Sequence, residues 1–176
     1  MGPALLAAVL DRRPNAAALL GAALPPAWPN EGDERFLRRR LEEIRRRPEA
    51  QKWLVRAILV SGPDGAVMAG HAGFHGPPGV NGPGYEDALE LGYTVFPEPR
   101  GRGYATEAAA ALIAWARGQG VARFVASVAP GNEPSLVIVS RLGFVRTGEQ
   151  WDDEDGLELV FELDASRTAA GAPRPA

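Results

Sequence analysis

The chain has 176 residues, a formal net charge of −3 and no cysteine. Disulfides, thiolate metal ligands and a cysteine nucleophile are therefore excluded, and with only two histidines the sequence predicts no metal site. The acidic balance argues against nucleic acid and an acidic membrane surface as partners. No apolar run reaches the roughly 18 residues of a membrane span, and the first residues lack the basic start of a signal peptide, so we expect a cytoplasmic protein.

The first part of the chain, up to Ala50, is predicted to be helical. One helix covers MGPALLAAVL, a second begins near Asn15 and is stopped by Pro25 and Pro26, and a third covers EGDERFLRRRLEEIRRR and ends near Pro48. In the third helix, apolar residues recur at helical spacing while arginines and glutamates fill the other faces. The glutamates within the arginine run predict a solvated helix face in place of a nucleic-acid patch.

Strands dominate from Trp53 onward. A hairpin is predicted from residues 53–60 and 66–75, joined by the turn SGPDG. The later elements are a loop at 76–87, a strand at 88–96, a helix at 104–120, a strand at 122–130, a short helix at 133–143, and a hairpin of 144–151 and 157–163. The helix at 104–120 is apolar on nearly every face, which predicts a buried helix. We expect one domain over 1–164 and a disordered tail over 165–176.

The segment EPRGRGYATEA connects a predicted strand to the start of a helix. A glycine-rich loop that opens a helix presents backbone amides without intrahelical partners, and the helix dipole adds partial positive charge. Gly101 and Gly103 would let a phosphate approach, and Arg100 and Arg102 would add charged donors, so the segment predicts an anion site. The alternative is a tight turn with solvent-exposed arginines. The P-loop needs Gly-Lys-Ser/Thr and the dinucleotide fingerprint needs glycine where Thr106 stands, so neither pattern fits.

A different pattern does fit, Arg/Gln-x-x-Gly-x-Gly/Ala, here Arg100, Gly103 and Ala105. Further on, NEPSLVIVSRLGF contains an Asn-x-x-Ser followed by Leu-Gly-Phe. From about Trp53 to Leu163 the chain thereby resembles the GNAT superfamily of N-acetyltransferases, and within it the RimJ/RimL branch. The resemblance implies an α/β fold with a mixed, strongly bent central β-sheet flanked by helices on both faces. It also implies acetyl transfer from acetyl-CoA to a primary amine by direct attack.

Two features depart from the family pattern. Members usually begin with a strand before the first helix, whereas this chain starts with the predicted helix MGPALLAAVL, so either that strand is missing or its role is filled otherwise. Many members also carry a tyrosine that protonates the departing thiolate, and Val139 stands at that position here. These departures leave open a non-catalytic acyl-CoA binding or sensing module of the same fold. A flavin or nicotinamide oxidoreductase is a more distant alternative.

The resemblance assigns acetyl-CoA binding to a strand end, the glycine-rich loop and the Asn-x-x-Ser segment. The residues expected to bind it are Val95, Phe96, Arg100, Gly101, Arg102, Gly103, Tyr104, Ala105, Thr106, Asn132 and Ser135. Backbone groups of the strand ending GYTVF would pair with the pantetheine arm. For Asn132 a helix cap, and for Ser135 a hydroxyl in the first helical turn, are alternative explanations.

Glu90 is the candidate base, because it is a lone carboxylate in an apolar strand, where burial would raise its pKa towards neutrality. The alternative is a structural carboxylate tied to a neighbouring group. Ser135 is the candidate donor to the thiolate. His75 and Tyr93 are candidate residues of the acceptor site, although a lone histidine is more often structural.

The acidic hairpin WDDEDG, Trp151 to Gly156, is explained by ordinary turn chemistry, but it would attract a cationic amine if it bordered the acceptor site. Relatives in the RimJ/RimL branch act on protein N-termini, and similar sequences modify small amines. A peptide N-terminus is therefore the first expectation for the acceptor, with the protein acting as a monomer or homodimer.

Overall fold

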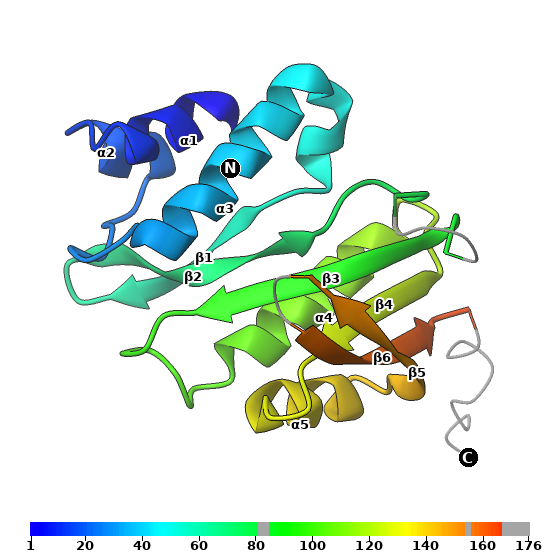
Figure 1. Ribbon diagram of the computed structural model, residues 1–176. Helices are drawn as coiled ribbons and strands as arrows, with labels where there is room; N and C mark the ends of the chain where they lie inside the picture. The colour runs from blue at the N-terminus through cyan, green and yellow to red at the C-terminus, as the bar shows by residue number, and fades with distance from the viewer. Residues whose placement is uncertain (81–84, 154–155, 167–176) are drawn as a thin grey trace, which may run out of the picture. The chain divides into compact units, whose positions relative to one another are not determined.

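The computed structural model describes residues 1–80, 85–153 and 156–166 (Figure 1). Parts of the predicted loop at 76–87 and of the acidic turn therefore lie outside the described residues, as does most of the predicted tail. The chain divides into two compact units. The first consists of Met1–Phe74 with Tyr93–Tyr104, and the second of His75–Gly92 with Ala105–Ala176.

The elements follow the predicted order. The helices are α1 (Pro3–Leu10), α2 (Ala16–Leu20), α3 (Glu31–Arg46), α4 (Tyr104–Arg117) and α5 (Glu133–Arg141), with a 3₁₀ helix η1 (Pro48–Lys52) after α3. The strands are β1 (Arg56–Gly62), β2 (Gly65–Phe74), β3 (Ala88–Val95), β4 (Arg123–Val128), β5 (Val145–Asp152) and β6 (Gly156–Asp164). In the described part of the chain they form a six-stranded mixed sheet in the order β1-β2-β3-β4-β6-β5. None of the described helices is long and apolar enough to cross a bilayer.

In the first unit, α1 and α3 pack over the β1–β2 hairpin (Figure 1). Helix α3 begins with a capping box, in which the side chains of Asn30 and Asp33 each accept a backbone hydrogen bond from the other residue at 3.0 Å. One face of α3 then buries Leu37, Leu41 and Ile44, as their spacing predicted. These side chains share a core with apolar residues of α1, β2 and the residue after β3, among them Leu6, Val9, Met68 and Phe96.

The predicted hairpin in this unit is confirmed. β1 and β2 run antiparallel, and Gly62 pairs with Gly65, so the turn is tighter than the predicted segment SGPDG. Helix α2 ends at Gly21, before the prolines that were expected to stop it. Residues 1–2 lead directly into α1. Ala23 makes an isolated parallel bridge to Val67 of β2.

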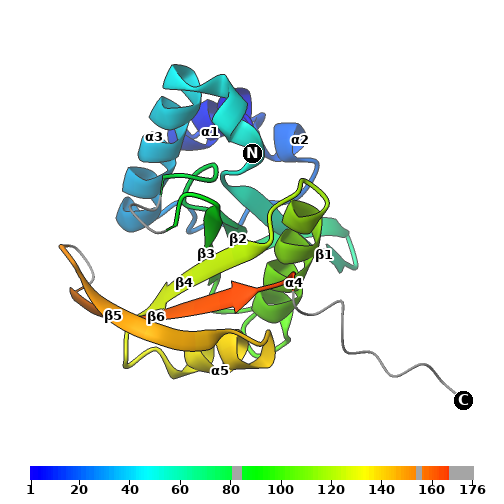
Figure 2. The ribbon, with the colours of Figure 1, turned by 90° about the vertical axis from the view of Figure 1, so that its right-hand side faces the viewer.

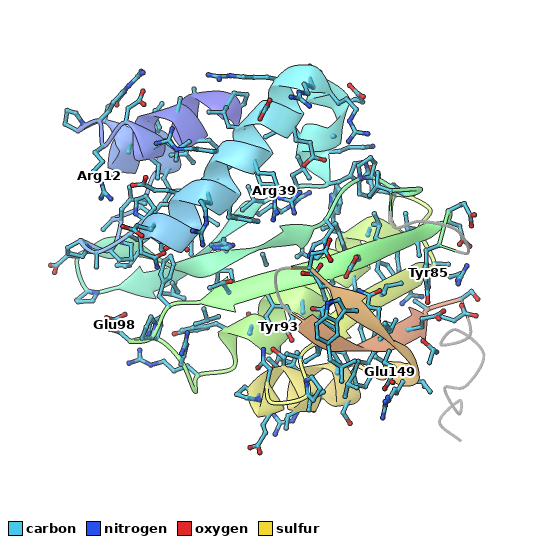
Figure 3. The ribbon with its side chains drawn as sticks, in the orientation of Figure 1. Arg12, Arg39, Tyr85, Tyr93, Glu98 and Glu149 are labelled. Carbon is cyan, nitrogen blue, oxygen red and sulfur yellow. The ribbon has the colours of Figure 1, made fainter. Side chains whose placement is uncertain are left out.

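In the second unit, β3 runs parallel to β4 and places Glu90 beside Val125. β4 pairs antiparallel with β6, and β6 pairs antiparallel with β5. β4 is largely buried. Ala88, Val125 and Val160 form a small core on one face of these strands, and Tyr85 packs against it (Figure 3).

The prediction that the helix after the glycine-rich loop is buried on nearly every face is wrong. α4, which Figure 2 shows beside the strands of its unit, buries a single stripe. The buried residues are Ala109, Leu112, Ile113 and Ala116. The exposed residues include Ala110, Ala111 and Ala114. Alanine has high helix propensity and a small apolar surface, so a solvated helix face can be built from it at little cost.

The end of the chain is ordered further than predicted. β6 reaches Asp164, and Ala165 is buried, with its N–H donating to the carbonyl oxygen of Ala122 at 2.8 Å. This backbone hydrogen bond extends the packed part of the chain into the predicted tail. Residues 167–176 lie outside the described residues.

Gly70 of β2 is tightly enclosed by β3. A Cβ at this position would lie 2.1 Å from the carbonyl oxygen of Thr94 and 2.9 Å from the Cα of Val95. Because both neighbours are backbone atoms, Gly70→Ala should lower the free energy of unfolding by about 1 to 3 kcal/mol or more. Gly148→Ala is the matched control, since nothing lies within 4 Å of the Cβ position of this strand glycine. Chemical denaturation that finds both variants equally stable would contradict the described contact of β2 with β3.

Candidate active site

The glycine-rich loop is a turn that holds both of its glycines at positive φ. Gly101 and Gly103 have φ angles of 75° and 84°, which side-chain-bearing residues rarely adopt. No atom lies within 4 Å of the Cβ position of either glycine. α4 begins at Tyr104, directly after the second glycine, so the first amides of the helix lie next to this turn.

Arg100 ties the loop to the end of β3. Its Nε donates to the carbonyl oxygen of Val95 at 3.0 Å, while the side chain stays exposed. Arg102 is also exposed. The guanidinium of Arg100 therefore helps to shape the loop, and its Nη groups remain donors for an anion.

Phe96, directly after β3, uses its backbone N–H and its ring in contacts within the protein. The N–H of Phe96 donates to the carbonyl oxygen of Ala69 at 2.9 Å, and its ring packs 5.8 Å from the ring of Trp28. Tyr93 is half-buried on the same strand (Figure 3). Since the N–H of Phe96 is already used, a pantetheine arm at this strand would have to pair with other backbone groups.

Glu90 lies in the second unit, with its side chain 15% exposed. Ser127 Oγ donates to Glu90 Oε1 at 2.7 Å, and His75 Nδ1 lies 3.3 Å from Glu90 Oε2. The parallel register brings Ser127 to this position, because β4 pairs Val125 with Glu90 and the next residue on the same face is two further along. His75 follows β2 directly, and its N–H donates to the carbonyl oxygen of Glu90 at 2.9 Å.

The pKa of Glu90 is lowered, which corrects the sequence-based expectation of a raised value. Burial is the largest single influence and raises the pKa, and the charge of Asp152 raises it further. The hydrogen bond and charge of His75, together with the hydrogen bond from Ser127, outweigh both. Glu90 is thus an ionised carboxylate that accepts from nearby donors. Although it is the only carboxylate within its apolar strand segment, the fold brings His75 and Ser127 beside it.

Sequence reasoning missed three polar residues around Glu90. Gln150 of β5 donates through Nε2 to Ser127 Oγ and to Glu158 Oε2, both at 3.1 Å. Gln150 and Glu158 are direct partners in the β5–β6 register. Two signals were present: Ser127 is the only hydroxyl residue in the apolar strand RFVASV, and a hairpin centred on the acidic turn places Gln150 opposite Glu158.

The imidazole of His75 lies against Gly92 of β3, where a side chain would leave it less room. A Cβ at Gly92 would lie 3.0 Å from His75 Nε2. The His75 side chain is 50% exposed, in contrast to the enclosed carboxylate beside it. The imidazole therefore reaches from Glu90 towards solvent along the strand.

The Asn-x-x-Ser segment forms the start of α5. Asn132 Oδ1 accepts from the Ser135 N–H at 3.2 Å, so the helix cap that was one explanation of Asn132 is present. Ser135 is half-buried in the first turn, and Val139 is buried one turn later. The position where relatives carry a tyrosine is therefore filled by a core side chain.

The lowered pKa of Glu90 predicts a pH-dependent effect of Glu90→Gln on stability. A carboxyl whose pKa is below its ordinary value of 4.5 stabilises the fold while it is ionised, and this stabilisation is lost as the pH falls from 4.5 through the folded-state pKa. The variant should therefore be less stable than the wild type at neutral pH, and the difference should narrow below pH 4.5. Denaturant unfolding across this range provides the measurement. A stability difference that widens on acidification would contradict this prediction, because ionisation of Glu90 would then destabilise the fold.

The chain is similar to known acetyltransferases in sequence and fold. The sequence profile of the acetyltransferase (GNAT) domain matches residues 5–145. A GnaT-family acetyltransferase from Bordetella pertussis is 27% identical, with a TM-score of 0.61 over 85% of this chain and 90% of that chain. None of the curated proteins matches.

Two further solved structures share the fold at lower identity. An acetyltransferase from Salmonella typhimurium, solved with its cofactor acetyl-CoA, is 22% identical, with a TM-score of 0.60 over 100% of this chain and 96% of that chain. A ribosomal-protein-alanine N-acetyltransferase from Brucella melitensis is 22% identical, with a TM-score of 0.59 over 93% and 96%. Since the profile match spans most of the chain and the mixed sheet agrees with these folds, the chain belongs to the GNAT acetyltransferase family and has its α/β fold.

Proposed function

We infer that the protein transfers an acetyl group from acetyl-CoA to the nitrogen of a primary amine by direct attack. The observation that carries this inference is the partly buried, ionised Glu90 with His75 Nδ1 at 3.3 Å. An amine arrives in water mostly as an ammonium ion and must lose a proton before it can attack a thioester. The Glu90–His75 pair supplies a group that takes up this proton.

The charge around the pair favours a cationic acceptor. Asp152 interacts electrostatically with Glu90, and Glu158 belongs to the same hydrogen-bonded group through Gln150. Carboxylates concentrated on one face raise the local concentration of cations. An ammonium group matches this field better than a neutral hydroxyl or a carboxylate acceptor does.

The loop before α4 is the proposed binding site for the pyrophosphate of acetyl-CoA. Gly101 and Gly103 leave the turn without side chains, and Arg100 and Arg102 bring two cationic side chains to it. The first helical turn, Tyr104 to Thr106, adds its backbone amides. The end of β3, at Val95 and Phe96, is the proposed site of the pantetheine arm.

Departure of the thiolate is assigned to the start of α5. Ser135 is half-buried there, and Asn132 holds the first turn, so a serine hydroxyl can donate to the sulfur. With Val139 in the core, no tyrosine hydroxyl is provided at that position. The same substitution favours the second candidate function, a non-catalytic acyl-CoA binding module, which would bind acetyl-CoA without turning it over.

For the acceptor we propose a protein or peptide N-terminus first and a small amine second. The Brucella melitensis structure described as a ribosomal-protein-alanine N-acetyltransferase supports this order. His75 and Tyr93 are the proposed acceptor-site residues. We place the reaction in the cytoplasm, in a RimJ/RimL-type protein that is a monomer or homodimer and has no nucleic-acid or membrane partner.

Gly103→Val should weaken acetyl-CoA binding about tenfold or more, because the loop amides lose their alignment and a charge-assisted hydrogen bond contributes about 1.5 to 3 kcal/mol. Gly120→Val is the matched control. Gly120, which follows α4, also has a positive φ, 90°, and an open Cβ position. Both variants should therefore lose similar stability through strain. Calorimetric titration with acetyl-CoA should find a weaker affinity for Gly103→Val alone. Equal affinities in the two variants would argue that the loop does not bind the cosubstrate.

Turnover separates the two candidate functions. Acetyl-CoA is offered with short peptides that carry free N-terminal alanine, serine or methionine, and with small aliphatic amines. The proposed function predicts CoA release that depends on the amine, and a product whose acetyl group is found on the amine nitrogen by tandem mass spectrometry. Tight acetyl-CoA binding without product from any of these amines would favour the binding module.

A further inference from the structure

We propose that His75 is the catalytic base and acts through Nε2, and that Gln150, Ser127 and Glu90 are positioning residues that set its tautomer. The proposal rests on the proposed function, since it names the atom that receives the amine proton. Its basis is a continuous series of hydrogen bonds from Glu158 to His75 in which each donor is determined by the one before it.

The order of donors starts at Glu158. A carboxylate only accepts, so the group of Gln150 that faces Glu158 at 3.1 Å is the amide Nε2. The same nitrogen carries a second hydrogen, which it directs at Ser127 Oγ, also at 3.1 Å. The serine oxygen therefore accepts from Gln150. Its single proton is left for Glu90 Oε1, 2.7 Å away.

The series ends at the imidazole. Glu90, ionised and already accepting from Ser127, offers only lone pairs to His75 Nδ1 at 3.3 Å. Nδ1 must therefore carry the hydrogen of the neutral ring. In a neutral imidazole the other nitrogen then has the lone pair, so the tautomer set by Glu90 presents Nε2 as the basic atom.

The positions of the two groups favour His75 over Glu90 as the base. The side chain of Glu90 is 15% exposed, whereas that of His75 is 50% exposed. A proton taken from the amine must pass to solvent before the next turnover, and the exposed ring can release it. Nε2 also lies beside Gly92, the residue directly before Tyr93–Phe96, the segment proposed to hold the thioester.

The proton balance is closed. The ammonium loses one proton to His75 Nε2, and its nitrogen then attacks the thioester carbonyl carbon. The N–C bond forms and the C–S bond breaks, and the electron pair of that bond leaves with the CoA sulfur. The nitrogen loses its second proton, the thiolate gains one, and imidazolium gives its proton to water. The products are the amide, CoA thiol and one proton in solution.

The first test measures the tautomer directly. Long-range ¹H–¹⁵N spectra report which ring nitrogen carries the hydrogen, and the chain contains only two histidines, so His75→Gln assigns the signals. Neutral His75 should be in the Nδ1–H form. Glu90→Gln, whose amide can donate to Nδ1, should shift it towards the Nε2–H form. Glu149→Gln on β5, where Glu149 pairs with Arg146, is the control and should leave it unchanged. An Nε2–H form in the wild type would overturn the proposal.

The second test uses chemical rescue with the peptide that the wild type acetylates best. His75→Ala should lower kcat by about 10² to 10⁴-fold, the usual contribution of a general base. Added imidazole should restore much of the rate, because the half-exposed site admits it. A folded His75→Ala variant with full activity would overturn the proposal, and so would a loss that imidazole does not restore, since a purely structural histidine gives that result. Absence of any wild-type turnover would count against the proposed function, while the tautomer spectra would still decide the role of Glu90.

Discussion

An ionised carboxylate enclosed in a β-sheet must be surrounded by donors, and Glu90 imposes this constraint on the second unit. Leaving it unpaired would cost several kcal/mol. The parallel register of β3 with β4 brings Ser127 to Glu90, and His75, the residue directly after β2, is the second donor. Gln150 and Glu158 then fix the direction of the serine hydroxyl. The polar residues around Glu90 are thus explained by the need to pair one partly buried carboxylate.

The proposed acetyl-CoA site depends on a different kind of constraint. The loop before α4 relies on backbone geometry, in which Gly101 and Gly103 hold φ angles that other residues rarely adopt. Side-chain chemistry at Glu90 and backbone chemistry in the loop can therefore change independently. The chain matches its family profile over residues 5–145 and is 27% identical to one solved member, and one fold can carry different sites in this way.

Most of the fold could be predicted from sequence, because glycines, prolines and apolar runs mark each element locally. The solvated face of α4 could not, since exposed alanines leave no polar signal. The pKa of Glu90 was predicted in the wrong direction because His75, which lowers it most, and Ser127, which lies 37 residues away in sequence, become its neighbours only in the folded sheet. The turn before α4 could be predicted because its glycines stand within one short segment of sequence. The roles of individual site residues remain predictions.

The central claim is that Glu90 stays ionised and orients His75, and titration of the Glu90 side-chain carboxyl by ¹³C NMR tests it most directly. The account predicts a midpoint below the ordinary value of 4.5 in the wild type, and a higher midpoint in Ser127→Ala, which lacks one of the donors. A wild-type midpoint above 4.5 would contradict the account, because Glu90 would then be the group that burial prepares to hold the proton.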